Sequence, residues 1–87
     1  MEKSLQGKNI LVTGASRGIG QAIAIHCASL GANVAGLATR TANLDATAAS
    51  VKELGGDFLA LEGDIALAAT SDDAIAAVVE KWGSLDG

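Results

Sequence analysis

A glycine-rich turn stands between an apolar run and a helical pattern near the start of the chain. The run Asn9-Ile10-Leu11-Val12 is followed at once by Thr13-Gly14-Ala15-Ser16-Arg17-Gly18-Ile19-Gly20, and a helical pattern continues from there. Its three glycines remove the Cβ atoms that would hold a phosphate away from the backbone, and a helix start offers unpaired N–H groups and a positive dipole end. The order of strand, glycine turn and helix therefore predicts a site for the pyrophosphate of a dinucleotide.

The residues after this turn separate two kinds of phosphate loop. A mononucleotide loop needs Lys and then Ser or Thr directly after its last glycine, whereas Gln21 and Ala22 follow Gly20. The mononucleotide type is therefore excluded.

Apolar runs and helical patterns alternate along the chain. We predict strands over residues 8–13, 33–38 and 58–62, and helices over residues 18–30, 43–54 and 71–82. This alternation predicts parallel βαβ units with right-handed crossovers, in which the strands lie in the order 3-2-1. One apolar stripe on each helix is expected to face the sheet. The predicted stripes are Ile19, Ile23, Cys27 and Leu30 on the first helix, Leu44, Ala48, Val51 and Leu54 on the second, and Ile75, Val78, Val79 and Trp82 on the third.

The first strand is predicted to lie at one edge of the sheet. In the doubly wound order a fourth strand covers that edge, and only three strands are predicted within residues 1–87. The N–H and C=O groups along the edge are therefore expected to lack partners within the chain, in an apolar sequence that favours pairing with another strand. We expect either self-association or pairing with the missing half of the fold.

Composition limits the classes of partner. The 87 residues are 49% hydrophobic and 18% charged, which is typical of one packed domain. A net charge of −4 and 2% aromatic residues disfavour nucleic acid, which needs a basic surface or stacking side chains. No apolar run reaches the roughly 18–20 residues of a membrane span and no signal peptide is recognisable, so we expect a cytoplasmic protein with no membrane partner. His26 has no neighbours at ligand spacing, so no metal site is predicted.

The spacing Thr-Gly-x-x-x-Gly-x-Gly over residues 13–20 resembles the glycine turn of the short-chain dehydrogenases/reductases. Three further segments are similar to that family: Gly31-Ala32-Asn33-Val34 at its second strand, Gly63-Asp64-Ile65 at its adenine contact, and Gly83-Ser84-Leu85-Asp86 before its fourth strand. The similarity is closest to the 3-oxoacyl-carrier-protein reductase type. The resemblance implies an α/β chain that forms the N-terminal half of a doubly wound Rossmann fold, with three helices and a partial dinucleotide-binding domain over residues 1–87.

The motif and the resemblance together predict a set of cofactor-binding residues. The glycines and Ile19 are expected along the pyrophosphate, the side chains of Ser16 and Arg17 near phosphate, and Asp64, by resemblance, at the adenine amino group with Ile65 beside the ring. The predicted residues are Gly14, Ser16, Arg17, Gly18, Ile19, Gly20, Thr39, Arg40, Asp64 and Ile65.

The end of the second predicted strand indicates which dinucleotide is bound. NAD-selective Rossmann proteins place an acid there to accept the ribose 2′-hydroxyl, but this chain has Ala38-Thr39-Arg40 and no acid until Asp45. Arg17 and Arg40 can flank a 2′-phosphate dianion, and Thr39 can donate a hydrogen bond to it. The sequence therefore favours NADP over NAD.

Two functions fit these observations. The first is a cofactor-binding fragment of an NADP(H)-dependent short-chain oxidoreductase that moves hydride between nicotinamide and a carbonyl or secondary alcohol. The resemblance assigns its acid–base chemistry to a Tyr, a Lys and a Ser in segments after residue 87, so no catalytic residue is predicted in this chain, which contains no Tyr. The second is a non-catalytic dinucleotide-binding or assembly module that docks through its open strand edge. The run Ile10–Val12 contains no polar or charged residue that would block strand pairing, so it favours the first of these functions.

Overall fold

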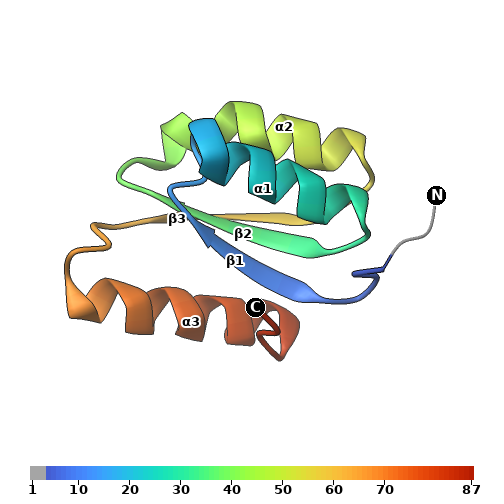
Figure 1. Ribbon diagram of the computed structural model, residues 1–87. Helices are drawn as coiled ribbons and strands as arrows, with labels where there is room; N and C mark the ends of the chain where they lie inside the picture. Colours follow the sequence, from blue (N-terminus) through green and yellow to red (C-terminus); the bar gives the residue numbers. More distant parts are fainter. Residues whose placement is uncertain (1–3) are drawn as a thin grey trace.

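A three-stranded parallel sheet forms the centre of the computed structural model, which describes residues 4–87 (Figure 1). Its strands are β1 (Asn9–Thr13), β2 (Asn33–Ala38) and β3 (Phe58–Glu62). They lie in the order β1-β2-β3, so β2 is in the middle and is buried from Val34 onward. The parallel pairing, the strand positions and the predicted 3-2-1 order are confirmed.

Helices cover both faces of the sheet. Helices α1 (Gly18–Ser29) and α2 (Asp45–Glu53) lie side by side on one face, and α3 (Ala68–Trp82) crosses the other (Figure 1). A short 3-10 turn, η1 (Thr41–Leu44), leads from β2 into α2. This arrangement places the connection after β2 on the same side of the sheet as the glycine-rich turn.

Helix α3 begins three residues before the predicted start at Ser71. The Leu67 N–H donates to the Asp64 carbonyl at 2.9 Å, and the Thr70 N–H donates to the Leu67 carbonyl at 3.0 Å. The chain therefore turns into the helix right after Leu67, where Ala68 and the next residue, also Ala, have high helix propensity.

Small residues form the buried side of α1. Ala24 and Ala28 are buried in the core, whereas Ile23 is 47% exposed and Ile19 is 81% exposed. The predicted stripe on this helix is therefore wrong at Ile19 and Ile23, whereas Cys27, from the same stripe, packs against the core. The sequence of α1 is apolar around most of its circumference, so the positions of its large residues do not mark its packed face, and alanines allow a closer approach to the sheet.

The other two helices follow their predicted stripes in part. Leu44 and Val51 are fully buried at α2, and Val78 is fully buried on α3. Ile75 and Val79, also predicted to face the sheet, are each 43% exposed, so the packed side of α3 is narrower than its apolar pattern.

The outer edge of β1 is covered in part by the end of the chain itself. The Leu11 N–H donates to the Gly87 carbonyl at 2.8 Å, and the Asp86 N–H donates to the Asn9 carbonyl at 2.8 Å. The side-chain amide of Asn9, which is 5% exposed, donates to the backbone carbonyl and the hydroxyl of Ser84, both at 3.1 Å. The expectation of unpaired groups is therefore wrong at Asn9 and Leu11.

Candidate functional site

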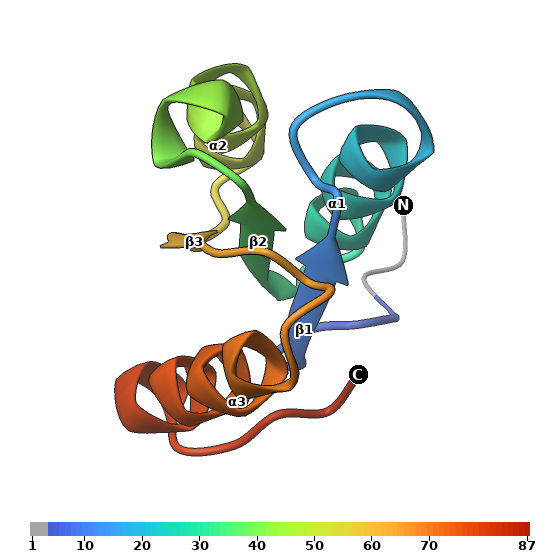
Figure 2. The ribbon, with the colours of Figure 1, turned by 90° about the vertical axis from the view of Figure 1, so that its left-hand side faces the viewer.

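The carboxyl ends of all three strands meet at one end of the molecule, which faces the viewer in Figure 2. There β1 leads through the glycine-rich turn into α1, β2 leads into η1, and β3 leads toward α3 (Figure 2). We call residues 14–17, between β1 and α1, the glycine loop. Open parallel sheets bind ligands at this end because the loops after the strands gather there.

The glycine loop is held against β2. Gly14 and Gly18 have φ angles of 63° and 61°, which residues with a side chain rarely adopt. The N–H groups of Gly14 and Ala15 donate to the Leu37 carbonyl at 3.0 and 3.4 Å. No side chain caps the N-terminus of α1, and its first turn holds no acid, so its N–H groups remain for an anion.

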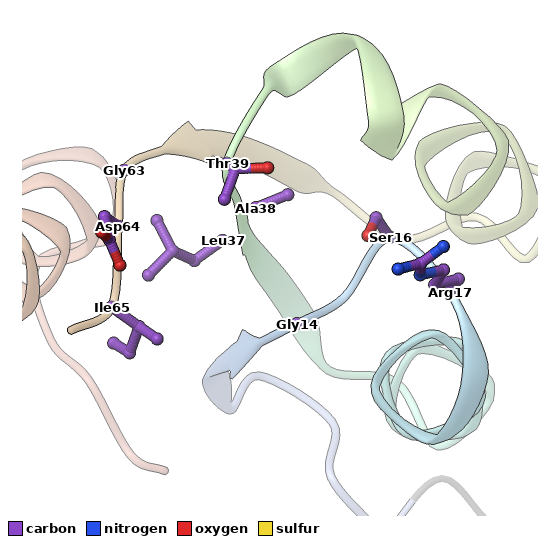
Figure 3. A pocket seen from close by; sticks show the side chains of 9 residues that line it. All are labelled: Gly14, Ser16, Arg17, Leu37, Ala38, Thr39, Gly63, Asp64 and Ile65. Carbon is purple, nitrogen blue, oxygen red and sulfur yellow. The ribbon is translucent and has the colours of Figure 1, made fainter.

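A hollow of about 380 Å³ lies between the glycine loop and the ends of β2 and β3. We call it the main hollow. Ser16 and Arg17 lie on one side of it, Asp64 and Ile65 lie on the other, and the end of β2 lies between them (Figure 3). The lining residues are Gly14, Ser16, Arg17, Leu37, Ala38, Thr39, Gly63, Asp64 and Ile65.

A second hollow, of about 340 Å³, is lined by Ser16, Arg17, Thr39 and Asn43. We call it the polar hollow. Its first three lining residues also line the main hollow, so the two hollows adjoin. All four side chains can donate hydrogen bonds, Arg17 is cationic, and none of the four carries a carboxylate. This wall chemistry suits an anion such as phosphate.

Six of the ten predicted cofactor-binding residues line the main hollow. They are Gly14, Ser16, Arg17, Thr39, Asp64 and Ile65. Gly18, Ile19 and Gly20 line neither hollow but form the first turn of α1, directly after Arg17. Arg40 also lines neither hollow; it is exposed and lies one residue after Thr39. The structure therefore brings the 2′-phosphate candidates Arg17 and Thr39 together and leaves Arg40 beside them.

Asp64 forms a turn and also lines the main hollow. One of its carboxylate oxygens accepts the Ala66 N–H at 2.9 Å, which holds the carboxylate in place at the end of β3. A carboxylate has acceptor capacity for several hydrogen bonds, so this turn leaves room for a donor from the hollow. The carboxylate can therefore hold this turn and still accept a hydrogen bond from a ligand in the hollow.

Several residues of the site were not predicted from the sequence. Leu37 and Ala38 are the last residues of β2, and their position at the carboxyl end of a central strand was the available signal. Asn43 was assigned only to the start of a helix. Its amide, five residues after the strand end and close to Thr39 and Arg40 in sequence, is the polar signal that could have identified it.

Residues 4–87 contain neither a cluster of metal ligands nor a membrane-spanning helix. No three His, Cys, Asp or Glu side chains come close enough in this part of the chain to share a metal ion. None of the helices in this part of the chain combines the length and the apolar character that a membrane crossing requires.

The parallel sheet, the glycine loop and the loops at the strand ends define an α/β fold of the Rossmann type. The family model for short chain dehydrogenases matches residues 8–87, and the chain belongs to this family.

Relatives with assigned activities are similar over most of this chain. It is 42% identical over 85 residues to L-rhamnose 1-dehydrogenase (NAD(P)(+)) of Sphingomonas sp. strain SKA58, covering 97% of this chain and 34% of that protein. It is 47% identical over 77 residues to a 3-oxoacyl-acyl-carrier-protein reductase of Pseudomonas aeruginosa, covering 88% and 30%. The chain thus spans about a third of the length of the curated relatives it matches.

Solved structures have the same fold. A short chain dehydrogenase from Burkholderia cenocepacia J2315, in complex with NADP, superposes with a TM-score of 0.88 at 42% identity. The match covers 94% of this chain and 34% of that one.

Proposed function

We propose that residues 1–87 are the cofactor-binding part of an NADP(H)-dependent oxidoreductase that transfers hydride between nicotinamide and a carbonyl group or secondary alcohol. A bound nicotinamide dinucleotide supplies or accepts the hydride in such a reaction. The residues of this chain hold the adenosine and phosphate end of the dinucleotide, and they keep the glycine loop and the start of α1 against its pyrophosphate.

The residues that line the polar hollow are the observation that supports NADP as the cofactor. A ribose 2′-phosphate is a dianion that needs donors and a cation, whereas a free 2′-hydroxyl is recognised by an acidic acceptor. Ser16, Thr39 and Asn43 offer donors around the Arg17 side of this hollow, and no carboxylate lines it. The B. cenocepacia relative is a complex with NADP, which agrees with this choice, and the Sphingomonas relative is named for both cofactors.

The opposite side of the main hollow suits adenine. Ile65 is 54% exposed at the rim and offers an apolar surface, and the Asp64 carboxylate beside it can accept the adenine amino group. Arg17 and Asp64 lie on opposite sides of the main hollow, so one adenosine placed between them would direct its ribose toward the polar hollow (Figure 3).

The relatives named above act on unlike substrates, by their names a sugar and an acyl chain on a carrier protein, although both are similar to this chain over most of its length. We therefore propose that the cofactor depends on residues 1–87, and that the choice of carbonyl or alcohol substrate depends on other segments of such enzymes.

Binding measurements test the cofactor assignment. The intact protein is titrated with NADPH and with NADH, and nicotinamide fluorescence reports binding. We expect NADPH to bind at least about tenfold more tightly, because the 2′-phosphate gains charge-assisted hydrogen bonds of roughly 1.5–3 kcal/mol. Equal affinities, or tighter binding of NADH, would contradict the proposal for NADP.

The proposed partner at the sheet edge is another strand, from a second copy or from a complementary part of the enzyme. Beyond Leu11, none of residues 4–87 pairs with the outer edge of β1, which continues to Thr13. Leu11→Lys would introduce a charge at this half-buried edge. Sedimentation velocity should then show loss of association, and an association unchanged by Leu11→Lys would contradict the assignment of this edge.

A further inference from the structure

A side chain of α2 reaches into the glycine loop. The hydroxyl of Thr47 donates a hydrogen bond of 2.8 Å to the carbonyl oxygen of Ala15, and both residues are fully buried. A buried hydroxyl is costly unless it is hydrogen-bonded, and so is a buried carbonyl. This bond therefore satisfies both groups at the point where α2 meets the loop.

The backbone of Ala15 is held from two sides. Its N–H donates to the Leu37 carbonyl of β2 at 3.4 Å, and its carbonyl accepts the Thr47 hydroxyl from α2. Ser16 and Arg17 follow Ala15 directly, and both line the polar hollow. Because their backbone continues from a residue fixed in this way, the bond to Thr47 helps to set where their side chains begin.

The facing wall of the polar hollow comes from the connection that carries Thr47. Thr39 and Asn43 lie on the segment between β2 and α2, and Thr47 follows Asn43 by four residues, about one helical turn. One hydrogen bond thus joins the segment that carries Thr39 and Asn43 to the segment that carries Ser16 and Arg17.

We infer that Thr47 is a positioning residue for recognition of the 2′-phosphate. It holds the wall formed by Ser16 and Arg17 in register with the wall formed by Thr39 and Asn43, so that both can contact one phosphate group. This inference rests on the proposed function. Thr47 itself is buried and lines neither hollow, so it acts through the Ala15 carbonyl.

The test compares two nucleotides that differ in the 2′-phosphate alone. Adenosine 2′,5′-bisphosphate and 5′-AMP are titrated into the intact protein by calorimetry, and the ratio of their dissociation constants is the readout. Thr47→Val keeps the shape of the side chain and removes the hydroxyl. We expect the preference for the bisphosphate to fall by about five- to tenfold, because the loss of one positioning hydrogen bond weakens contacts that only this nucleotide makes.

Two matched variants separate positioning from general loosening of the fold. Thr47→Ser retains the hydroxyl and should retain the preference. Val51→Ala removes a fully buried side chain from the same helix and should lower stability without changing the preference.

Each outcome decides one point. If the ratio of the two dissociation constants is unchanged in Thr47→Val, or falls equally in Val51→Ala, the positioning role is overturned while the cofactor proposal stands. Equal affinity of the wild-type protein for the two nucleotides would overturn the cofactor proposal, and this inference with it.

Discussion

A methyl group on the α-carbon of Gly20 would overlap the carbonyl oxygen of Gly14. The first turn of α1 therefore packs directly on the glycine loop, with no space for a side chain between them. This close contact brings the N–H groups at the start of α1 to the same end of the sheet as the main hollow.

Gly20→Ala is expected to lower stability and weaken dinucleotide binding together. The added methyl group forces the loop and helix apart, and overpacking of this kind costs about 1–3 kcal/mol. Urea unfolding followed by the fluorescence of Trp82 measures the first effect, and titration with NADPH measures the second. Ala22→Ser, at an exposed position on the same helix, serves as the control. Wild-type stability and affinity in Gly20→Ala would show that the loop yields without cost.

Arg17→Ala is expected to weaken NADPH binding more than NADH binding. Arg17 lines both hollows and is the cation among the residues around the polar hollow. Losing its pair with a 2′-phosphate should cost about 1.5–3 kcal/mol, and NADH has no such group to lose. Parallel titrations with the two dinucleotides check the difference. Lys81→Ala removes an exposed cation on α3, away from the lining residues, and should change neither affinity.

Arg40→Asp is expected to shift preference from NADP toward NAD. The side chain lines neither hollow, yet it follows Thr39 directly, so a carboxylate there would repel a 2′-phosphate and could accept a ribose hydroxyl. The NADPH to NADH affinity ratio is the measurement. The change in this ratio should be smaller than in Arg17→Ala, because Arg40 lines neither hollow. A ratio identical to that of the wild type would show that Arg40 is not part of the site.

Asn9→Ala is expected to release the end of the chain from β1. The side-chain nitrogen of Asn9 donates both hydrogen bonds to Ser84. The side-chain oxygen of Asn9 accepts a hydrogen bond of 2.9 Å from the side-chain amide of Asn33. Truncation removes these hydrogen bonds to the exposed Ser84 and the half-buried Asn33, and each such bond contributes about 0.5–1.5 kcal/mol. Hydrogen exchange at the Leu11 amide, which donates to Gly87, should become faster. Equal protection of this amide in both proteins would show that the backbone bonds hold this segment without the side chain.

The 87-residue chain by itself is expected to bind dinucleotide without oxidising NADPH. The family resemblance assigns proton transfer to a Tyr, and this chain contains none. Absorbance at the NADPH band with a panel of ketones and aldehydes provides the assay. Turnover that survives repurification would mean that another group moves the proton.

The sequence was sufficient to predict the strands and their order because strand–helix alternation admits few topologies. Helix faces were harder to predict. On α1, Ala24 and Ala28 are buried while Ile19 and Ile23 are exposed. Hydrophobicity alone would predict burial of the isoleucines and exposure of the alanines. On α3 the start depends on the turn at Asp64, a tertiary feature that propensity does not record.

In the candidate site too, some residues could be predicted from the sequence and others could not. A local motif identifies Gly14, Ser16 and Arg17 because the function of a glycine turn depends on residues that are adjacent in sequence. Asn43 lines the polar hollow and Thr47 bonds to the glycine loop, and only the packing of α2 against the loop reveals these positions. No short-range pattern links Thr47 to Ala15, which lies 32 residues before it.

The bond between Asn9 and Asp86 joins positions 77 residues apart, whereas Asn9 and its β2 neighbour Asn33 are 24 apart. Contacts of long sequence separation carry a larger loop-closure cost and form later than near ones. As the chain leaves the ribosome, β1, β2 and β3 can therefore pair before the residues that cover β1 have emerged. During that interval the apolar edge of β1 lacks its cover at Asn9 and Leu11 as well, so a nascent molecule is open to edge-to-edge aggregation along the whole strand.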